Sequence, residues 1–121
     1  MMRIFLVFLL GALVSLSHAA TLVSAEEVSK DKSSRLILDV RNADEFAAGH
    51  LPGAINIPHD KVTGDDSRLK DWKDKPVLVY CRSGRRSGLA ADKLEQAGFS
   101  KVQKLEGDLP GWEAKGYPVE R

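Results

Sequence analysis

The fold is decided by a stretch in the second half of the chain that reads Pro76-Val77-Leu78-Val79-Tyr80-Cys81-Arg82-Ser83-Gly84-Arg85-Arg86-Ser87-Gly88. Its first part is a run of β-formers with the length of a strand that is buried on both faces. Gly, Ser and Arg follow the cysteine, and apolar residues then recur at helical spacing up to Gly98. The pattern predicts a strand over 77–80, a tight polar loop over 82–88 and a helix over 89–97, with Gly98 as the residue that ends the helix.

Cys81 is the only cysteine of the chain and lies where the predicted strand ends. N–H groups of a Gly-containing loop and of a helix N-terminus together form a concave site for an anion. A free cysteine is mostly protonated at pH 7, and a helix terminus contributes only about 0.3–1 kcal/mol toward an anion. Loop N–H groups and the arginines of the loop (Arg82, Arg85 and Arg86) are therefore expected to add to the stabilisation. We predict an activated thiolate that is open to solvent at the edge of the sheet.

A buried and inert cysteine is the alternative interpretation of Cys81. It is disfavoured because three arginines and two serines follow within six positions, and so many arginines are costly to place beside a purely structural thiol.

The loop Cys81-Arg82-Ser83-Gly84-Arg85-Arg86-Ser87 resembles the active-site loop of rhodanese-type sulfurtransferases, in which the pattern is Cys-Arg-x-Gly-x-Arg-Ser/Thr. Every specified position of that pattern is met. Cysteine phosphatases carry an arginine six positions after the cysteine, whereas in this chain Arg86 lies five positions on and Ser87 occupies the sixth. Phosphatase and arsenate-reducing relatives have that longer loop, so the shorter loop favours sulfur chemistry over these two alternatives.

A second block supports the same resemblance, with Leu38-Asp39-Val40-Arg41 followed by Phe46-Ala47-Ala48-Gly49-His50-Leu51-Pro52-Gly53-Ala54-Ile55-Asn56-Ile57-Pro58. It is similar to the other rhodanese hallmark, D-x-R followed by F-x-x-G-H-L/I-P-G-A-x-N-I-P. In the family this block is mainly architectural, so we expect His50 to fix a turn rather than to act as a general base. Asp39 and Arg41 are expected to pair under the active loop, and Arg41 is also a candidate for substrate binding.

Strands are predicted near Leu36, Ala54, Val77 and Val102, and they alternate with predicted helices. Ser24 and Asn42 are the expected N-caps of two of these helices. Such alternation is typical of an α/β fold with a largely parallel sheet. Ligands of these sheets bind outside the carboxyl ends of the strands, where Cys81 and Arg41 both lie. The resemblance implies a single rhodanese-like domain whose central sheet is flanked by helices. The charged segment 61–75 is expected to be a surface connection.

The segment 106–118 resembles the closing part of the family, with Gly107, Trp112, Gly116 and Pro118 in place. Asp108 stands where a second glycine is usual. This departure is expected to alter a turn near the mouth of the site, so it bears on the choice of substrate more than on the fold.

The N-terminus has the pattern of a secretory signal peptide, in which Arg3 precedes the apolar run 4–14 and Ser17-His18-Ala19 offers small residues for cleavage after Ala19. An uncleaved membrane anchor is the alternative, but the apolar run is shorter than the roughly 20 residues that a span prefers. The expected organisation is a signal peptide over 1–19 and a mature domain over 20–121. The mature protein is expected in the periplasm or secreted, with no membrane attachment.

Composition narrows the function classes further. The 18 Lys and Arg balance 17 Asp and Glu, so no strong field indicates nucleic acid as a partner. A single cysteine forms no internal disulfide, and no His/Cys spacing suits a metal. The resemblance implies neither a metal nor an organic cofactor.

The resemblance implies a sulfurtransferase of the thiosulfate type that acts by double displacement through a persulfide on Cys81. A small anionic donor such as thiosulfate would be held by Arg82 and Arg86, while loop N–H groups stabilise charge on the sulfur. Cyanide, a small-molecule thiol or a protein thiol would accept the sulfur. A persulfide-carrying or protein-binding module with little free turnover remains the alternative, because both would share one loop. The residues predicted to bind substrate are Arg41, Arg82, Ser83, Gly84, Arg85, Arg86 and Ser87.

Overall fold

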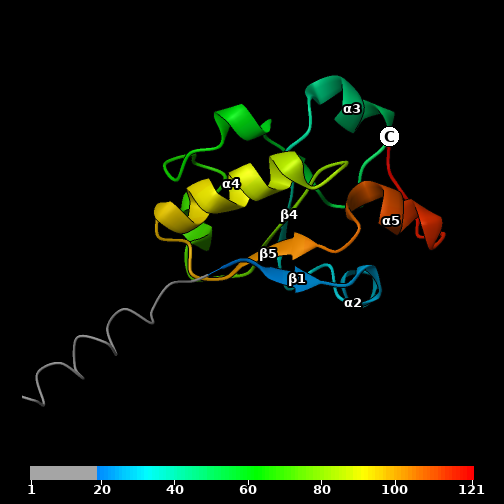
Figure 1. Cartoon of the computed structure of the whole chain (residues 1–121), viewed down its shortest axis with the longest axis horizontal. Helices are drawn as coiled ribbons and strands as arrows, with labels where there is room; N and C mark the ends of the chain where they lie inside the picture. The colour runs from blue at the N-terminus through cyan, green and yellow to red at the C-terminus, as the bar shows by residue number, and fades with distance from the viewer. Residues whose placement is uncertain (1–18) are drawn as a thin grey trace, which may run out of the picture.

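The computed structural model describes residues 19–121, so the predicted signal peptide lies, apart from Ala19, outside the described residues. A five-stranded sheet forms the centre of the molecule, and helices cover both of its faces (Figure 1). The strand order is β1-β5-β4-β2-β3, and every pair of neighbouring strands is parallel. The predicted α/β fold with a parallel sheet is confirmed.

The strands are β1 (Thr21–Val23), β2 (Leu36–Asp39), β3 (Ile55–Asn56), β4 (Val77–Tyr80) and β5 (Val102–Leu105). The helices are α2 (Ala25–Lys30), α3 (Ala43–Ala48), α4 (Arg85–Gln96) and α5 (Asp108–Ala114), with 3₁₀ turns η1 (His59–Lys61) and η2 (Lys70–Trp72). Within residues 19–121, none of the helices is long and apolar enough to cross a membrane.

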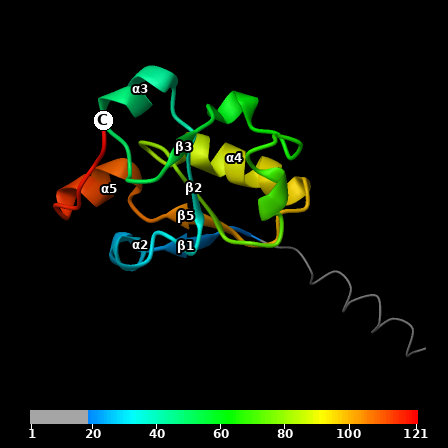
Figure 2. The ribbon, with the colours of Figure 1, turned by 180° about the vertical axis from the view of Figure 1, so that it is seen from behind.

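The central strand β4 supplies both halves of the core, because successive side chains of a strand point to opposite faces. Val77 and Val79 belong to the apolar cluster under α4, whereas Leu78 and Tyr80 belong to the cluster under α2 and α5. All four residues are buried. The view from behind shows α4 on one side of the strands and α2 on the other (Figure 2). An uninterrupted apolar strand is therefore what places Cys81 at the centre of the sheet's carboxyl edge.

The segment 61–75 is only partly the surface connection that its charges predict. Val62 and Leu69 are buried in the cluster under α4, and the 3₁₀ turn η2 follows Leu69 directly. The prediction is wrong for these two residues because the chain must cross the α4 face of the sheet between β3 and β4. Its charged residues stay at the surface while Val62 and Leu69 fill the core and Trp72 packs partly buried against it.

The two expected N-caps start the helices before and after β2. The Ser24 hydroxyl accepts a hydrogen bond from the N–H of Glu27 at 3.1 Å, at the start of α2. At the start of α3 the Asn42 N–H donates to Glu45 Oε1 at 3.0 Å. The second cap fixes α3 beside the carboxyl edge of the sheet, where Glu45 reaches the site.

Candidate active site

Cys81 follows the last residue of β4, and the connection to α4 is shorter than the sequence predicts. The helix begins at Arg85 rather than at Leu89, so the loop contains only Arg82, Ser83 and Gly84. The prediction of a loop over 82–88 is wrong because arginine is a good helix former and the chain turns at a single residue. Gly84 makes that turn with a φ of +94°, in the left-handed region that favours glycine. Leu89, one of the residues at helical spacing, is exposed.

The short loop folds backbone N–H groups onto the sulfur. The N–H of Gly84 donates to Cys81 Sγ at 3.1 Å, and the N–H of Ser87 donates to it at 3.4 Å. The Ser87 hydroxyl oxygen lies 3.5 Å from the same sulfur. This arrangement provides the predicted concave anion site, made of the loop and the first turn of α4.

The expectation that the sulfur is open to solvent is wrong in this conformation, since Cys81 has 0% of its area exposed. The physical reason is the early start of α4. A three-residue loop wraps closely around Sγ, whereas a seven-residue loop would leave it room. The alternative interpretation was a cysteine that is both buried and inert, and the structure agrees with the first of these two properties. The polar contacts from Gly84 and Ser87 distinguish the thiol from an ordinary apolar core residue.

The three arginines that follow Cys81 differ in their contacts: Arg82 lies in the loop, and Arg85 and Arg86 lie in the first turn of α4. Arg82 and Arg85 are exposed, whereas Arg86 pairs with Glu45 of α3, its Nη1 and Nη2 lying 2.6 and 3.1 Å from the two carboxylate oxygens. Hydrogen bonds from Arg86 lower the pKa of Glu45 to about 2, and the same pairing raises the pKa of Arg86. Donor binding by these three arginines stays a prediction, and Arg86 would have to share its guanidinium with Glu45.

Arg41 lies under the site in a buried network. Its Nε and Nη2 donate to Asp39 at 3.0 and 2.7 Å, and Nη2 also donates to the carbonyl of Gly49 at 2.7 Å. The predicted Asp39–Arg41 pair is therefore confirmed. With 5% of its side chain exposed, Arg41 is held by the scaffold, and its role in substrate binding remains a prediction that the burial does not favour.

Tyr80 is a member of this network that the sequence did not reveal. Its hydroxyl donates to Asp39 Oδ2 at 2.6 Å and accepts the N–H of Leu51 at 3.0 Å. Burial, together with the nearby Asp39 carboxylate, raises the pKa of Tyr80. Tyr80 looks like an apolar strand residue in the sequence, and no periodic signal indicates that its hydroxyl links β4 to the turn at Leu51.

His50 occupies the architectural place that was expected. Its Nδ1 lies 2.8 Å from the carbonyl oxygen of Phe46, and its ring stacks on the Phe46 ring with centroids 3.7 Å apart. Its backbone pairs with that of Glu120 in an isolated bridge. Within residues 19–121, no group of three His, Cys, Asp or Glu side chains is placed to hold a metal ion.

Asp108, at the start of α5, contacts the cysteine directly. Its Oδ1 accepts the backbone N–H of Cys81 at 2.9 Å, and the next N–H, of Leu109, donates to the Cys81 carbonyl at 3.1 Å. The one available signal was that Asp108 stands where the resemblance leads one to expect glycine. The contact itself spans 27 residues of sequence and could not be read from any local pattern.

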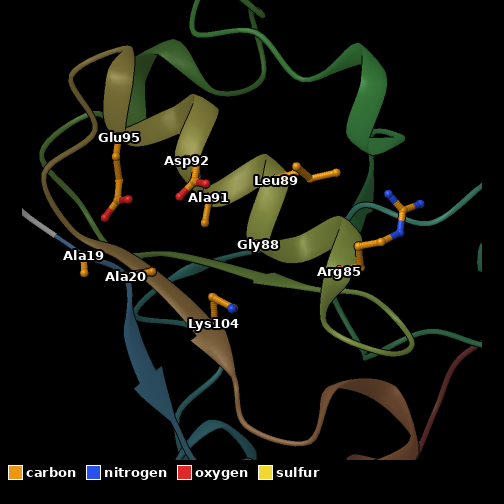
Figure 3. Close-up of a pocket in the computed structure, with 9 residues that line it drawn as sticks. All are labelled: Ala19, Ala20, Arg85, Gly88, Leu89, Ala91, Asp92, Glu95 and Lys104. Atoms are coloured by element: carbon orange, nitrogen blue, oxygen red, sulfur yellow. The ribbon is translucent and has the colours of Figure 1, made fainter.

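A pocket of about 510 Å³ lies beside the site, between α4, Lys104 of the internal strand β5 and the chain before β1 (Figure 3). Lys104 lies across from Gly88, where an added Cβ would be 3.7 Å from the Lys104 amine. Arg85 lies at one end and the chain start, Ala19 and Ala20, lines it as well. Cys81 does not line this pocket, so it is a neighbour of the site and not the site itself.

The comparisons with known proteins agree with this geometry. Residues 24–115 match the family model described as a rhodanese-like domain, and the chain belongs to this family. A sulfurtransferase of Allochromatium vinosum is 33% identical over 100 residues, which cover 80% of this chain and 92% of that protein. A putative sulfur carrier protein of Bacillus subtilis, YrkF, is 33% identical over 90 residues, covering 74% of this chain and 47% of that protein.

Among solved structures, the crystal structure of a thiosulfate sulfurtransferase from Pseudomonas aeruginosa superimposes with a TM-score of 0.75 and 27% identity. The match covers 84% of this chain and 20% of that one. The rhodanese-like fold is thus shared with sulfurtransferases, whose reaction is consistent with a cysteine surrounded by N–H donors.

The Glu45–Arg86 pair predicts a pH-dependent contribution to stability. The pKa of Glu45 is lowered to about 2 in the folded protein, whereas a glutamate in the unfolded chain has a pKa of about 4.3. The pair therefore contributes fully to the free energy of unfolding above a pH of about 4.3, and this contribution is lost as the pH falls toward 2. Glu45→Gln is expected to lower the free energy of unfolding by about 1 kcal/mol at pH 7, since the pair is partly exposed. The difference from the wild type should vanish near pH 2.

Urea titrations at several pH values measure this difference. Glu26→Gln is the matched control, because Glu26 pairs with Lys30 at 3.5 Å with both side chains largely exposed. The control should change stability little at any pH. An equal loss in Glu45→Gln at pH 7 and near pH 2 would contradict the assignment.

Proposed function

We propose that the protein is a sulfurtransferase that moves sulfane sulfur from a donor such as thiosulfate to a thiophilic acceptor through a persulfide on Cys81. The thiolate attacks the outer sulfur of thiosulfate, a new S–S bond forms, and the S–S bond of the donor breaks. Sulfite leaves with the electron pair. Cyanide or a thiol then attacks the outer sulfur of the persulfide and regenerates the Cys81 thiolate.

The single observation that carries the proposal is the convergence of the Gly84 and Ser87 N–H groups on Sγ, at 3.1 and 3.4 Å. These donors favour the negatively charged thiolate of Cys81. Arg82 in the loop and Arg85 at the start of α4 are both exposed and supply positive charge for an anionic donor. Membership of the rhodanese-like family, with a sulfurtransferase among the relatives, supports the same reaction.

Burial of Cys81 adds a requirement to this mechanism. A donor reaches Sγ only when the loop of Arg82, Ser83 and Gly84 moves aside. Arg82 and Ser83 are exposed and the loop is held to the sulfur by N–H donors, so the opening involves few packed side chains. We expect iodoacetamide to alkylate Cys81 in the folded protein, more slowly than it alkylates a free cysteine.

A persulfide carrier is the second candidate, favoured by the likeness to the putative sulfur carrier protein of B. subtilis. Both candidates load sulfur on Cys81 and differ in how they release it. An enzyme discharges its persulfide to cyanide or to small thiols with turnover, whereas a carrier discharges rapidly only to a protein thiol.

Mass spectrometry tests the proposal after incubation of the purified protein with thiosulfate. One added sulfur atom on Cys81, released as thiocyanate when cyanide is added, is the expected result. A protein that stays unmodified, with a thiol that iodoacetamide also fails to alkylate, would overturn both the enzyme and the carrier.

The site of action is part of the proposal. The signal-peptide pattern of residues 1–19 supports export, so the sulfur transfer would take place in the periplasm or outside the cell. Sequencing of the mature N-terminus from a periplasmic extract tests this, with Ala20 as the expected first residue.

A further inference from the structure

Asp108 is the feature of the site that the sulfur transfer described above does not use. It is the first residue of α5 and has a φ of +52°, the one positive φ outside glycine among residues 19–121. Such a backbone conformation is uncommon for residues with a Cβ and persists where surrounding interactions hold it. The hydrogen bond that Asp108 Oδ1 accepts from the Cys81 N–H at 2.9 Å is an interaction of that kind.

The carboxylate of Asp108 differs from the other acidic groups near Cys81 in its pairing. Asp39 is paired with Arg41, and Glu45 is paired with Arg86. Within the described chain from residue 19 onward, Asp108 has no ion-pair partner. Among residues 19–121 no cationic side chain therefore lies within ion-pair distance of Asp108, in contrast to Asp39 and Glu45.

The second oxygen of this carboxylate faces the loop that covers the sulfur. A Cβ added at Gly84 would lie 3.4 Å from Asp108 Oδ2, and the N–H of the same Gly84 donates to Sγ at 3.1 Å. A donor anion that approaches Sγ past this loop thus comes close to the Asp108 charge.

The Ser87 hydroxyl connects the carboxylate to the sulfur. Its oxygen lies 3.5 Å from Cys81 Sγ, 3.4 Å from Asp108 Oδ1 and 3.1 Å from the Gly84 carbonyl oxygen. A hydroxyl has one proton to donate. The Gly84 carbonyl, which is the nearest of the three, and the Asp108 carboxylate both compete with the anionic sulfur for that proton.

We propose that Asp108 sets the donor selectivity of the site by opposing dianionic sulfur donors more strongly than monoanionic ones. The inference rests on the proposed sulfur transfer. Coulomb repulsion by one carboxylate is twice as large for a dianion as for a monoanion at the same distance. Thiosulfate then reacts, but a monoanionic thiosulfonate or persulfide is the donor class that the site favours.

Thiosulfate and methanethiosulfonate are the probes that isolate this effect. Both present a terminal sulfur bonded to a sulfonyl-type sulfur, and they differ because a methyl group replaces one charged oxygen. The Cys81 thiolate attacks the terminal sulfur of either donor and the donor S–S bond breaks. Sulfite leaves from thiosulfate and methanesulfinate leaves from methanethiosulfonate, each with the electron pair.

The experiment measures the second-order rate constant of Cys81 persulfidation with each probe, by quenched-flow mass spectrometry of the wild type and of Asp108→Asn. Asparagine keeps an oxygen to accept the Cys81 N–H and tolerates a positive φ. The variant is expected to react about tenfold faster with thiosulfate and about threefold faster with methanethiosulfonate. The thiosulfate constant divided by the methanethiosulfonate constant should therefore rise about threefold. General damage to the site would lower both constants and leave this ratio unchanged.

Asp74→Asn is the matched control. Asp74 is exposed and precedes β4, at the end of the sheet opposite to Cys81, so both constants should equal those of the wild type. Asp108→Gly relieves the positive φ and removes the charge, and it should change the ratio in the same direction as Asp108→Asn.

A ratio that stays at the wild-type value in both Asp108 variants, while loading proceeds, overturns this inference and leaves the sulfur transfer intact. Absence of loading by either probe in the wild type instead overturns the proposed function, and the inference with it. Added salt should reduce the difference between wild type and Asp108→Asn, because screening weakens the interaction.

Discussion

Replacing Cys81 with serine is expected to abolish the transfer of sulfur from thiosulfate to cyanide, with a loss of at least about a thousandfold. A serine oxygen does not carry the sulfane sulfur as a persulfide, and the chain has no other cysteine to replace it. Thiocyanate formation and the mass of the protein after donor treatment are the measurements. The variant should show neither turnover nor added sulfur.

The fold provides the control for this variant. Serine is close in size to cysteine and can accept the N–H groups of Gly84 and Ser87, so unfolding by urea should change little. Wild-type protein that has been alkylated at its single cysteine should lose turnover to the same extent. Turnover that survives in Cys81→Ser would place the chemistry elsewhere in the molecule.

Sequence patterns predicted those parts of the structure that are determined by residues close to one another in the sequence. The apolar run 77–80 is the buried central strand, Gly98 follows the end of α4 with a φ of +97°, and Asp39 pairs with Arg41 two residues away. In each case the interaction is decided by residues within one strand, one helix end or one turn. The motif spacing placed Cys81 at the carboxyl edge of the sheet for the same reason.

Contacts between distant segments could not be predicted in this way. The Arg86–Glu45 bond spans 41 residues and the Cys81–Asp108 bond spans 27. Hydrophobic periodicity shows which side of an element is buried but not which polar groups meet at the end of the sheet. The burial of Cys81 depends on the first residue of α4, and an Arg-rich run with Gly and Ser is compatible with both a loop and a first helical turn.

Removing the carboxylate of Asp39 is expected to have the largest effect on stability, because it leaves Arg41 as an unpaired charge in the protein interior. Asp39→Asn should lower the free energy of unfolding by about 3–5 kcal/mol, a large part of the 5–15 kcal/mol that holds a domain folded. The new amide would present N–H donors where Arg41 Nη2 and the Tyr80 hydroxyl now donate to Oδ2, at 2.7 and 2.6 Å. Urea unfolding at 25 °C, followed by tryptophan fluorescence, measures the loss.

The chain contains its own matched control, since the Asp-x-Arg arrangement occurs twice. Asp66 accepts from Arg68 N, Nε and Nη2 at 2.9, 3.0 and 2.8 Å, and Asp39 accepts from the same three atoms of Arg41 at 2.9, 3.0 and 2.7 Å. The side chain of Arg68 is 53% exposed, whereas that of Arg41 is 5% exposed. Asp66→Asn should therefore cost about 1 kcal/mol or less. Similar losses in the two variants would show that bond geometry, and not burial, determines the energy of this pair, and would remove the reason for assigning Arg41 to the scaffold.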